Sequence, residues 1–290
     1  MEQRTYPGLK QSVSVVGLGA GQVGSGDVSE EQASQLLNGA LDMGVTLIDT
    51  ARGYGLSEER IGRHIGHRRD EFTLSTKVGY GVEGEEDWTG PCIRKGVERA
   101  LGLLRTDVLD IVHLHSCPPD TLVKTDVIDA LHACVDHGLV RVAAYSGDGG
   151  SLDAAIGTAR FGGWMASLNI CDQRIIDAQM ARLGGAGFIA KRPLANIAWR
   201  FTEPPVGDYA ETYWERLQTM QLDLGPEPDA TALRFSAFAD GVTCVITGTK
   251  SVEHLRRNVE IVQHGPLPAE AIDTIRAAFR RCDDGWIGQT

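Results

Sequence analysis

The sequence contains no closely spaced cysteines. Its six cysteines stand far apart, at positions 92, 117, 134, 171, 244 and 282. This spacing excludes a disulfide framework and supplies no zinc ligand set, so we expect reduced thiols and no metal site. No apolar run approaches the roughly 18 residues of a membrane span, and the segment MEQRTYPGLKQ lacks the apolar core of a signal peptide. We therefore expect a cytoplasmic protein with no membrane partner.

Basic residues are also in short supply. The 28 Lys and Arg are outnumbered by 39 Asp and Glu, which gives a formal net charge of -11. Such a surface repels nucleic acid and anionic lipid, so we expect a small-molecule partner instead. Any bound phosphate would need a local basic cluster. The hydrophobic content of 42% is ordinary for a globular chain.

Short, nearly continuous apolar runs alternate with helical patterns along the chain. Strands that are apolar throughout are typical of a parallel sheet covered by helices on both faces. The expected strands span 13–19, 45–51, 72–79, 107–115, 139–147, 164–171, 187–193 and 243–248. Eight such strands predict an α/β fold, a single (β/α)8 (TIM) barrel domain over residues 1–290, near the usual barrel length of about 250 residues.

Helix start signals fall between these strands. Ser29 to Gln32 forms a capping box, and Ser57 is expected to be the N-cap of a second helix. Further helices are expected at 90–104, 126–137, 151–160, 172–183, 211–223, 229–239, 252–262 and 268–281. The last two follow the eighth strand, so the barrel should carry extra C-terminal helices.

The longest irregular stretches follow the third, fourth and seventh strands. They cover residues 80–89, 116–125 and 195–210. Barrel active sites are built from the loops that follow the strands. Polar residues at the strand ends are therefore the candidates for chemistry.

A glycine motif near the start suggests a different fold. Residues 19–24 read G-x-G-x-x-G directly after a strand, and Asp49 ends the next strand, as in a dinucleotide-binding (Rossmann) domain. That motif needs a helix that begins inside the glycine run, whereas the capping signal comes only at Ser29. We interpret the segment as a flexible loop after the first barrel strand and keep the Rossmann fold as the less favoured alternative.

Four polar residues at strand ends match the needs of carbonyl reduction. Hydride addition leaves an alkoxide that needs a proton, and tyrosine can supply it when an adjacent ammonium lowers the tyrosine pKa. Asp49 lies on the second strand, Tyr54 in the loop after it, Lys77 on the third strand, and His115 ends the fourth. Lys77 is the hardest to explain structurally, because a lysine on a buried strand needs an opposite charge. His113 shares the face of His115 and could be structural.

The segment GVTLIDTARGYGLSEERIGRHIGHRRDEFTLSTKVG (44–79) resembles the aldo-keto reductase superfamily, whose signature reads D-T-A-x-x-Y-G-x-S-E-x-x-I-G before a strand ending T-K. The resemblance continues at 103–116, 138–147, 188–196 and 245–260, and so covers essentially the whole chain. It implies a catalytic tetrad of Asp49, Tyr54, Lys77 and His115. In that tetrad Tyr54 is the acid/base, Lys77 lowers its pKa, Asp49 anchors Lys77, and His115 orients the carbonyl. It also implies reduction of aldehydes and ketones, or oxidation of the matching alcohols.

The resemblance further implies an extended NADP(H) bound across the barrel mouth, in preference to NAD(H), which the site could also take. Its contacts would be Gly19, Ser146, Asn169, Lys191, Arg192, Pro193, Leu194, Gly248, Thr249, Lys250, Ser251, His254 and Asn258. Lys250 and Ser251 would meet the 2′-phosphate at a helix N-terminus, and Asn258 the adenine. Lys191 stands where an aromatic residue often stacks on the nicotinamide, so that aromatic is missing.

Trp88 is the expected wall of an open substrate pocket, and we expect a monomer or weak homo-oligomer. Two alternatives of another class remain open. The fold could serve a nicotinamide-binding regulatory subunit that senses redox state. It could also serve a metal-assisted hydrolase or an aldolase, in which Lys77 would form a Schiff base.

Overall fold

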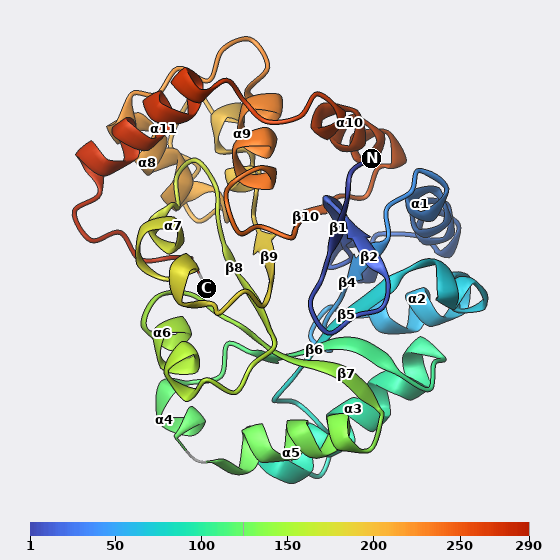
Figure 1. The fold of residues 1–290 in the computed structure, drawn as a ribbon. Coiled ribbons are helices and arrows are strands. Elements are labelled where there is room, and N and C mark those ends of the chain that lie inside the picture. Colours follow the sequence, from blue (N-terminus) through green and yellow to red (C-terminus); the bar gives the residue numbers. More distant parts are fainter. Residues whose placement is uncertain (124, 290) are drawn as a thin grey trace.

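Eight parallel strands close into a barrel in the computed structural model, which describes residues 1–123 and 125–289. The strands run in the order β10-β3-β4-β5-β6-β7-β8-β9, and β10 pairs with both β9 and β3. Their bounds are Val16–Gly19 (β3), Leu47–Asp49 (β4), Thr73–Val78 (β5), Leu109–His115 (β6), Val140–Ser146 (β7), Gly163–Ser167 (β8), Gly187–Lys191 (β9) and Cys244–Gly248 (β10). The expected (β/α)8 architecture is confirmed, and helices surround the strands (Figure 1).

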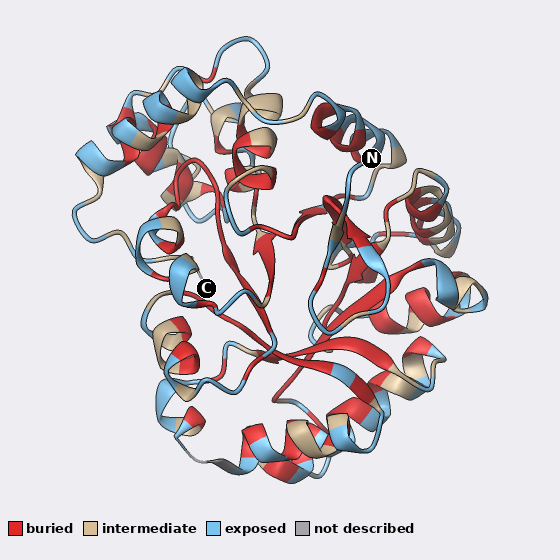
Figure 2. Cartoon of the chain, in the orientation of Figure 1, coloured by how far each residue is buried: buried red, intermediate tan, exposed pale blue. Residues whose placement is uncertain are grey.

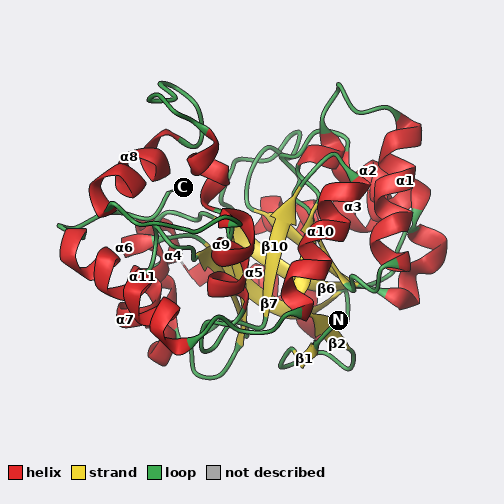
Figure 3. Ribbon diagram, turned by 90° about the horizontal axis from the view of Figure 1, so that it is seen from above, coloured by secondary structure: helices red, strands yellow, loops and turns green. Residues whose placement is uncertain are grey.

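A hairpin that the sequence pattern did not predict precedes the barrel. Strands β1 (Gln3–Thr5) and β2 (Ser12–Ser14) pair antiparallel. The expected strand 13–19 is therefore wrong in extent, since its first residues belong to the hairpin and only Val16–Gly19 joins the barrel. Figure 3 shows the hairpin at the end of the barrel opposite the long loops. Tyr6, between the two strands, is fully buried against the starts of β8 and β9, and so closes this end.

Nine α-helices of eight or more residues pack around the described barrel. They are α1 (Glu30–Asp42), α2 (Ser57–His64), α3 (Gly90–Leu104), α5 (Thr125–Asp136), α6 (Gly149–Thr158), α8 (Glu211–Met220), α9 (Pro228–Ala237), α10 (Val252–Gln263) and α11 (Ala269–Cys282). The Ser29 capping box is present, with Gln32 as its partner. The strands are buried almost throughout, and each helix turns a buried face toward them (Figure 2). In the described parts of the chain, no helix is both long and apolar enough to cross a membrane.

Several expected boundaries are wrong. The helix expected at 172–183 is broken into α7 (Arg174–Ala178) and a 3-10 turn, η3 (Met180–Arg182). Ser57 is the first residue of α2 and not its N-cap, because its hydroxyl donates to the Ala20 carbonyl oxygen inside the core. The expected loop at 116–125 contains a helical turn, α4 (Pro119–Leu122), and the loop at 195–210 begins with η4 (Ala195–Arg200). Lys124 and Thr290 lie outside the described residues.

The glycine loop after β3 is packed in place, which corrects the interpretation of residues 19–24 as flexible. It contains a 3-10 turn, η1 (Gln22–Gly24), and no helix begins inside the glycine run, so the Rossmann alternative is wrong. The buried Arg60 guanidinium on α2 donates to the backbone carbonyl oxygens of Val23, Ser25 and Val28. Hydrogen bonds from a charged donor are worth about 1.5–3 kcal/mol each, so this arginine fixes the loop.

Candidate active site

A buried ion pair lies inside the C-terminal end of the barrel. The Lys77 ammonium is 2.7 Å from an Asp49 carboxylate oxygen, and both side chains are 2% exposed. Lys77 also donates to the Thr50 carbonyl oxygen, and the Ser75 hydroxyl donates to the other Asp49 oxygen. Burial alone would lower the pKa of Lys77, but the Asp49 carboxylate raises it above its ordinary value. The ammonium therefore stays charged at neutral pH.

Tyr54 and His115 flank this pair. The Lys77 ammonium lies 4.8 Å from the centroid of the Tyr54 ring. The His115 ring meets the Tyr54 ring edge-on, with 6.1 Å between the centroids. Since the carboxyl ends of parallel strands meet at one end of a barrel, the structure brings together all four residues that the sequence suggested for catalysis.

The two histidines of β6 occupy different environments. His113 is fully buried, and its Nε2 lies 3.1 Å from the Ser75 hydroxyl. His115 lies two residues further along β6, nearer the barrel mouth, and is only partly buried. Burial and the charges of Lys77 and Lys191 lower the pKa of His115 to about 3. Its imidazole is therefore neutral near pH 7.

A cleft of about 460 Å³ leads from this site across the barrel mouth. Its walls include Gly19, Gly21, Asp49, Tyr54, Lys191, Arg192, Pro193, Leu194, Asn196, Tyr209 and Gly248. Tyr54 and Gly248, which lies at the end of β10, thus line the same cleft. Six of the thirteen expected cofactor residues line this space: Gly19, Lys191, Arg192, Pro193, Leu194 and Gly248.

Ser146 and Asn169 are buried and do not line this cleft. The Asn169 amide is already occupied: its nitrogen donates to the Arg192 carbonyl oxygen, and its oxygen accepts from the Cys171 N–H. Asn169 thereby holds the backbone that follows β9. Ser146 is the last residue of β7, and it is 1% exposed.

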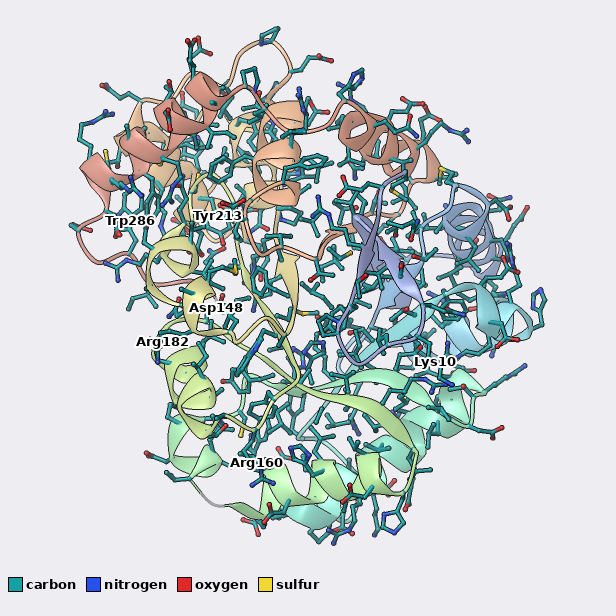
Figure 4. The ribbon with its side chains drawn as sticks, viewed as in Figure 1. Lys10, Asp148, Arg160, Arg182, Tyr213 and Trp286 are labelled. Carbon is teal, nitrogen blue, oxygen red and sulfur yellow. The ribbon has the colours of Figure 1, made fainter. Side chains whose placement is uncertain are left out.

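A second ion pair involves Lys191, which lines the same cleft as Tyr54. The Lys191 ammonium is 2.7 Å from an Asp148 carboxylate oxygen, and these side chains are 16% and 4% exposed. Arg192 next to it contacts the Tyr209 hydroxyl and the Gln289 carbonyl oxygen. A neighbouring hollow of about 440 Å³ lies between Asp148 and Trp286, which Figure 4 labels on the same side of the barrel. The segment after α11 therefore packs against these residues.

Several basic residues of the expected phosphate site form ion pairs with acidic residues of the protein itself. Lys250 forms an ion pair with Asp27 at 2.6 Å, and both side chains are well exposed. The Ser251 hydroxyl caps α10 by accepting from the His254 N–H. Arg257 turns away and pairs with Asp229 and Glu227 of the α9 region, and Arg256 pairs with Glu253. Asn258 is buried. Lys250 and the start of α10 thus remain as the basic feature here.

Three contributors to the site were missed from the sequence. The Tyr80 hydroxyl is 2.8 Å from His115 Nδ1, and its ring stacks on the His115 ring. Ser75 orients Asp49, and Asp148 neutralises Lys191. Alternation on β5 would have placed Ser75 on the face of Lys77. Trp88, expected as a pocket wall, packs on Tyr80 at 5.9 Å between ring centroids.

The side chains that could bind a metal ion are His, Cys, Asp and Glu. Within residues 1–123 and 125–289, no group of three or more His, Cys, Asp or Glu is arranged to hold a metal ion. All six cysteines are free, and five of them are buried.

Comparison with known proteins identifies relatives across the full chain. An uncharacterised oxidoreductase of Bacillus subtilis is 23% identical, with 96% of each chain covered. An L-galactose dehydrogenase of Arabidopsis thaliana is 26% identical over 88% of this chain and 85% of that one. The holo form of an aldo-keto reductase from Bacillus halodurans superposes with a TM-score of 0.83 at 24% identity over 96% of both chains. The family model described as "Aldo/keto reductase family" matches residues 15–280. The chain therefore belongs to the aldo/keto reductase family and is an oxidoreductase of that family.

Proposed function

We propose that this protein transfers hydride between NADP(H) and a small carbonyl or alcohol, with Tyr54 as the proton donor. One observation carries the proposal: Tyr54 lies against the Lys77–Asp49 ion pair and beside a neutral His115, in the wall of a cleft of about 460 Å³. Burying an ion pair carries a desolvation cost, and such pairs are found preferentially at functional sites. Here the ammonium of the pair lies 4.8 Å from the centroid of the Tyr54 ring.

In the reductive direction, bound NADPH supplies the hydride that adds to the carbonyl carbon. The Tyr54 hydroxyl donates its proton to the carbonyl oxygen as negative charge develops there. The Lys77 ammonium stabilises the phenolate that remains, and Asp49 holds the ammonium in position. His115 donates a hydrogen bond to the same oxygen and so fixes the carbonyl relative to Tyr54. Alcohol oxidation follows the same path in reverse.

The residues of the cleft fit a dinucleotide. Asp49 and Tyr54 of the tetrad line the cleft together with residues 191–194 and with Gly248 at the end of β10. The backbone of Arg192, Pro193 and Leu194 and the guanidinium of Arg192 would hold the pyrophosphate. Ser146, at the end of β7, would bind the carboxamide. Gly19 leaves room at the cleft wall for the cofactor.

The preference for NADP(H) rests on the Lys250 region. Asp27 places a carboxylate 2.6 Å from Lys250, and this contact supports the proposal that Lys250 binds an anionic group. The 2′-phosphate would replace that carboxylate, and the N-terminus of α10, with Gly248, Thr249, Ser251 and His254, would add N–H donors and positive potential. Asn258 is buried on the inner face of α10, where it supports the adenine pocket.

The substrate would enter between Tyr54, His115, Tyr80 and Trp88. The two aromatic rings give this pocket an apolar wall, which suits aldehydes and ketones with a hydrophobic or flat substituent. Turnover of such substrates, followed by the loss of NADPH absorbance across a panel of carbonyls, tests the proposal. Reduction of several panel members is expected. Tight NADPH binding without any turnover would instead favour the redox-sensing regulatory subunit.

A further inference from the structure

His115 makes one specific contact that involves neither cofactor nor substrate. Its Nδ1 lies 2.8 Å from the Tyr80 hydroxyl oxygen. The two rings are nearly parallel, with an interplanar angle of 28° and 5.5 Å between centroids. Tyr80 begins the loop after β5, three residues beyond Lys77, and so reaches across from the neighbouring strand to the end of β6. The pair is thus fixed by both stacking and a hydrogen bond.

A neutral imidazole carries one proton, which can reside on either ring nitrogen. The low pKa of His115 follows from its burial and from Lys77 and Lys191, so the ring is neutral near pH 7. Burial also raises the pKa of Tyr80, which keeps its phenol protonated and able to donate. The contact therefore joins an O–H donor to a ring nitrogen that can accept.

The geometry selects one of the two tautomers. When the Tyr80 hydroxyl donates to Nδ1, the ring proton must sit on Nε2. Among the described residues Nε2 has no hydrogen-bonding partner, so it remains available at the mouth of the barrel. The opposite tautomer would leave the phenol hydrogen without an acceptor in a half-buried site. It would also aim a lone pair, instead of an N–H, at the substrate oxygen.

We infer that Tyr80 is a positioning residue: its hydroxyl holds His115 in the Nε2-protonated tautomer, so that His115 can donate to the carbonyl oxygen. The inference rests on the proposed function for the purpose of that N–H, but the tautomer itself is a property of the protein alone. Tyr80 acts through His115 and need not touch the reacting atoms.

The test is the protonation site of the His115 ring in wild type and in Tyr80→Phe. Phenylalanine keeps the stacking and removes only the hydroxyl. Protein with ¹⁵N-labelled histidine rings is studied by long-range ¹H–¹⁵N correlation, and His115→Gln assigns the His115 signals. Tyr6→Phe is the matched control, because it deletes a buried tyrosine hydroxyl at the opposite end of the barrel.

In wild type and in Tyr6→Phe we expect a single tautomer with the proton on Nε2 and an accepting Nδ1. In Tyr80→Phe we expect the ¹⁵N shifts to move toward a mixture of tautomers. We also expect kcat for carbonyl reduction to fall about three- to tenfold, as for the loss of one hydrogen bond. NADPH binding measured by fluorescence should be unchanged.

A wild-type ring protonated on Nδ1, or a Tyr80→Phe ring that keeps the wild-type tautomer, would overturn the inference. These results are distinct from a failure of the proposed function. Absence of carbonyl turnover in wild type would reject the function and leave the tautomer measurement valid. Normal turnover with an unmoved tautomer would reject the role of Tyr80 alone.

Discussion

Gly24 lies directly against the backbone of Tyr54. A Cβ added at Gly24 would come within 1.6 Å of the Tyr54 carbonyl oxygen and 2.8 Å of the Ser57 nitrogen. The third glycine of the G-x-G-x-x-G run therefore lets the loop after β3 pack on the loop that carries the proposed proton donor. This glycine contacts the segment that positions Tyr54, which is a different role from the one its motif suggests.

Replacing Gly24 with alanine should displace Tyr54. Both backbones cannot keep their places with a methyl group between them, and overpacking of this kind costs about 1–3 kcal/mol. We expect carbonyl reduction to fall at least about tenfold in Gly24→Ala, if the strain is relieved by moving the Tyr54 loop. Gly26→Ala is the control, because no atom lies within 4 Å of its added Cβ. Equal kcat in the two variants would contradict the positioning role of Gly24.

Lys250 and Asp27 should have opposite effects on cofactor choice. Lys250→Ala removes the cation proposed for the 2′-phosphate, so the ratio of NADPH to NADH affinity should fall. Asp27→Asn removes the carboxylate that pairs with Lys250 at 2.6 Å, so this ratio should rise. Both effects should shrink as salt is added, because the charges are exposed. Titration of each variant with both cofactors gives the ratio, and an unchanged ratio in Lys250→Ala would show that the phosphate binds elsewhere.

Asp172 should give stability an unusual pH dependence. It is 4% exposed, and its Oδ2 accepts from the Tyr213 hydroxyl at 3.3 Å. Burial, with help from the charge of Asp148, raises the pKa of Asp172 to about 6. The folded state therefore binds this proton more tightly than the unfolded state, whose aspartate pKa is about 3.9. The free energy of unfolding should thus decrease as pH rises from about 4 to about 6 on account of this group.

Asp172→Asn keeps the shape and an acceptor for Tyr213, but it has no charge to bury. We expect the variant to lose this decrease, so that its stability relative to wild type improves by about 2 kcal/mol between about pH 4 and neutral pH; the loss of the carboxylate beside Arg216 adds a constant offset. Denaturant unfolding across that pH range measures both quantities. Identical pH profiles for wild type and Asp172→Asn would refute the assignment of a buried ionising carboxyl.

The barrel strands and the Lys77–Asp49 pair could be predicted from the sequence, because burial strongly restricts which residues a strand can carry. A lysine such as Lys77 within a continuous apolar strand requires a carboxylate, and Asp49 on the preceding strand was the nearest candidate. Parallel strand order then places both at the same end of the barrel. The β1–β2 hairpin escaped prediction, since three-residue strands with polar sequences carry no recognisable hydrophobic period.

The parts that depend on loop conformation could not be predicted. Tyr80 contacts His115 only because the loop after β5 folds over the end of β6. Ser57 has the residue type of an N-cap, yet a buried acceptor at Ala20 competes for its hydroxyl. The sequence of α10 also does not reveal that Arg257 forms ion pairs with Glu227 and Asp229 of the α9 region. These partners are distant in the sequence, so local sequence patterns do not predict the contacts.

The central claim is that Tyr54 donates the proton when the carbonyl is reduced. It is tested most directly by comparing wild type with Tyr54→Phe for both NADPH oxidation with a carbonyl substrate and NADPH binding by fluorescence titration. The account predicts that turnover disappears in Tyr54→Phe while the affinity for NADPH is preserved. Turnover at the wild-type rate in Tyr54→Phe would contradict it.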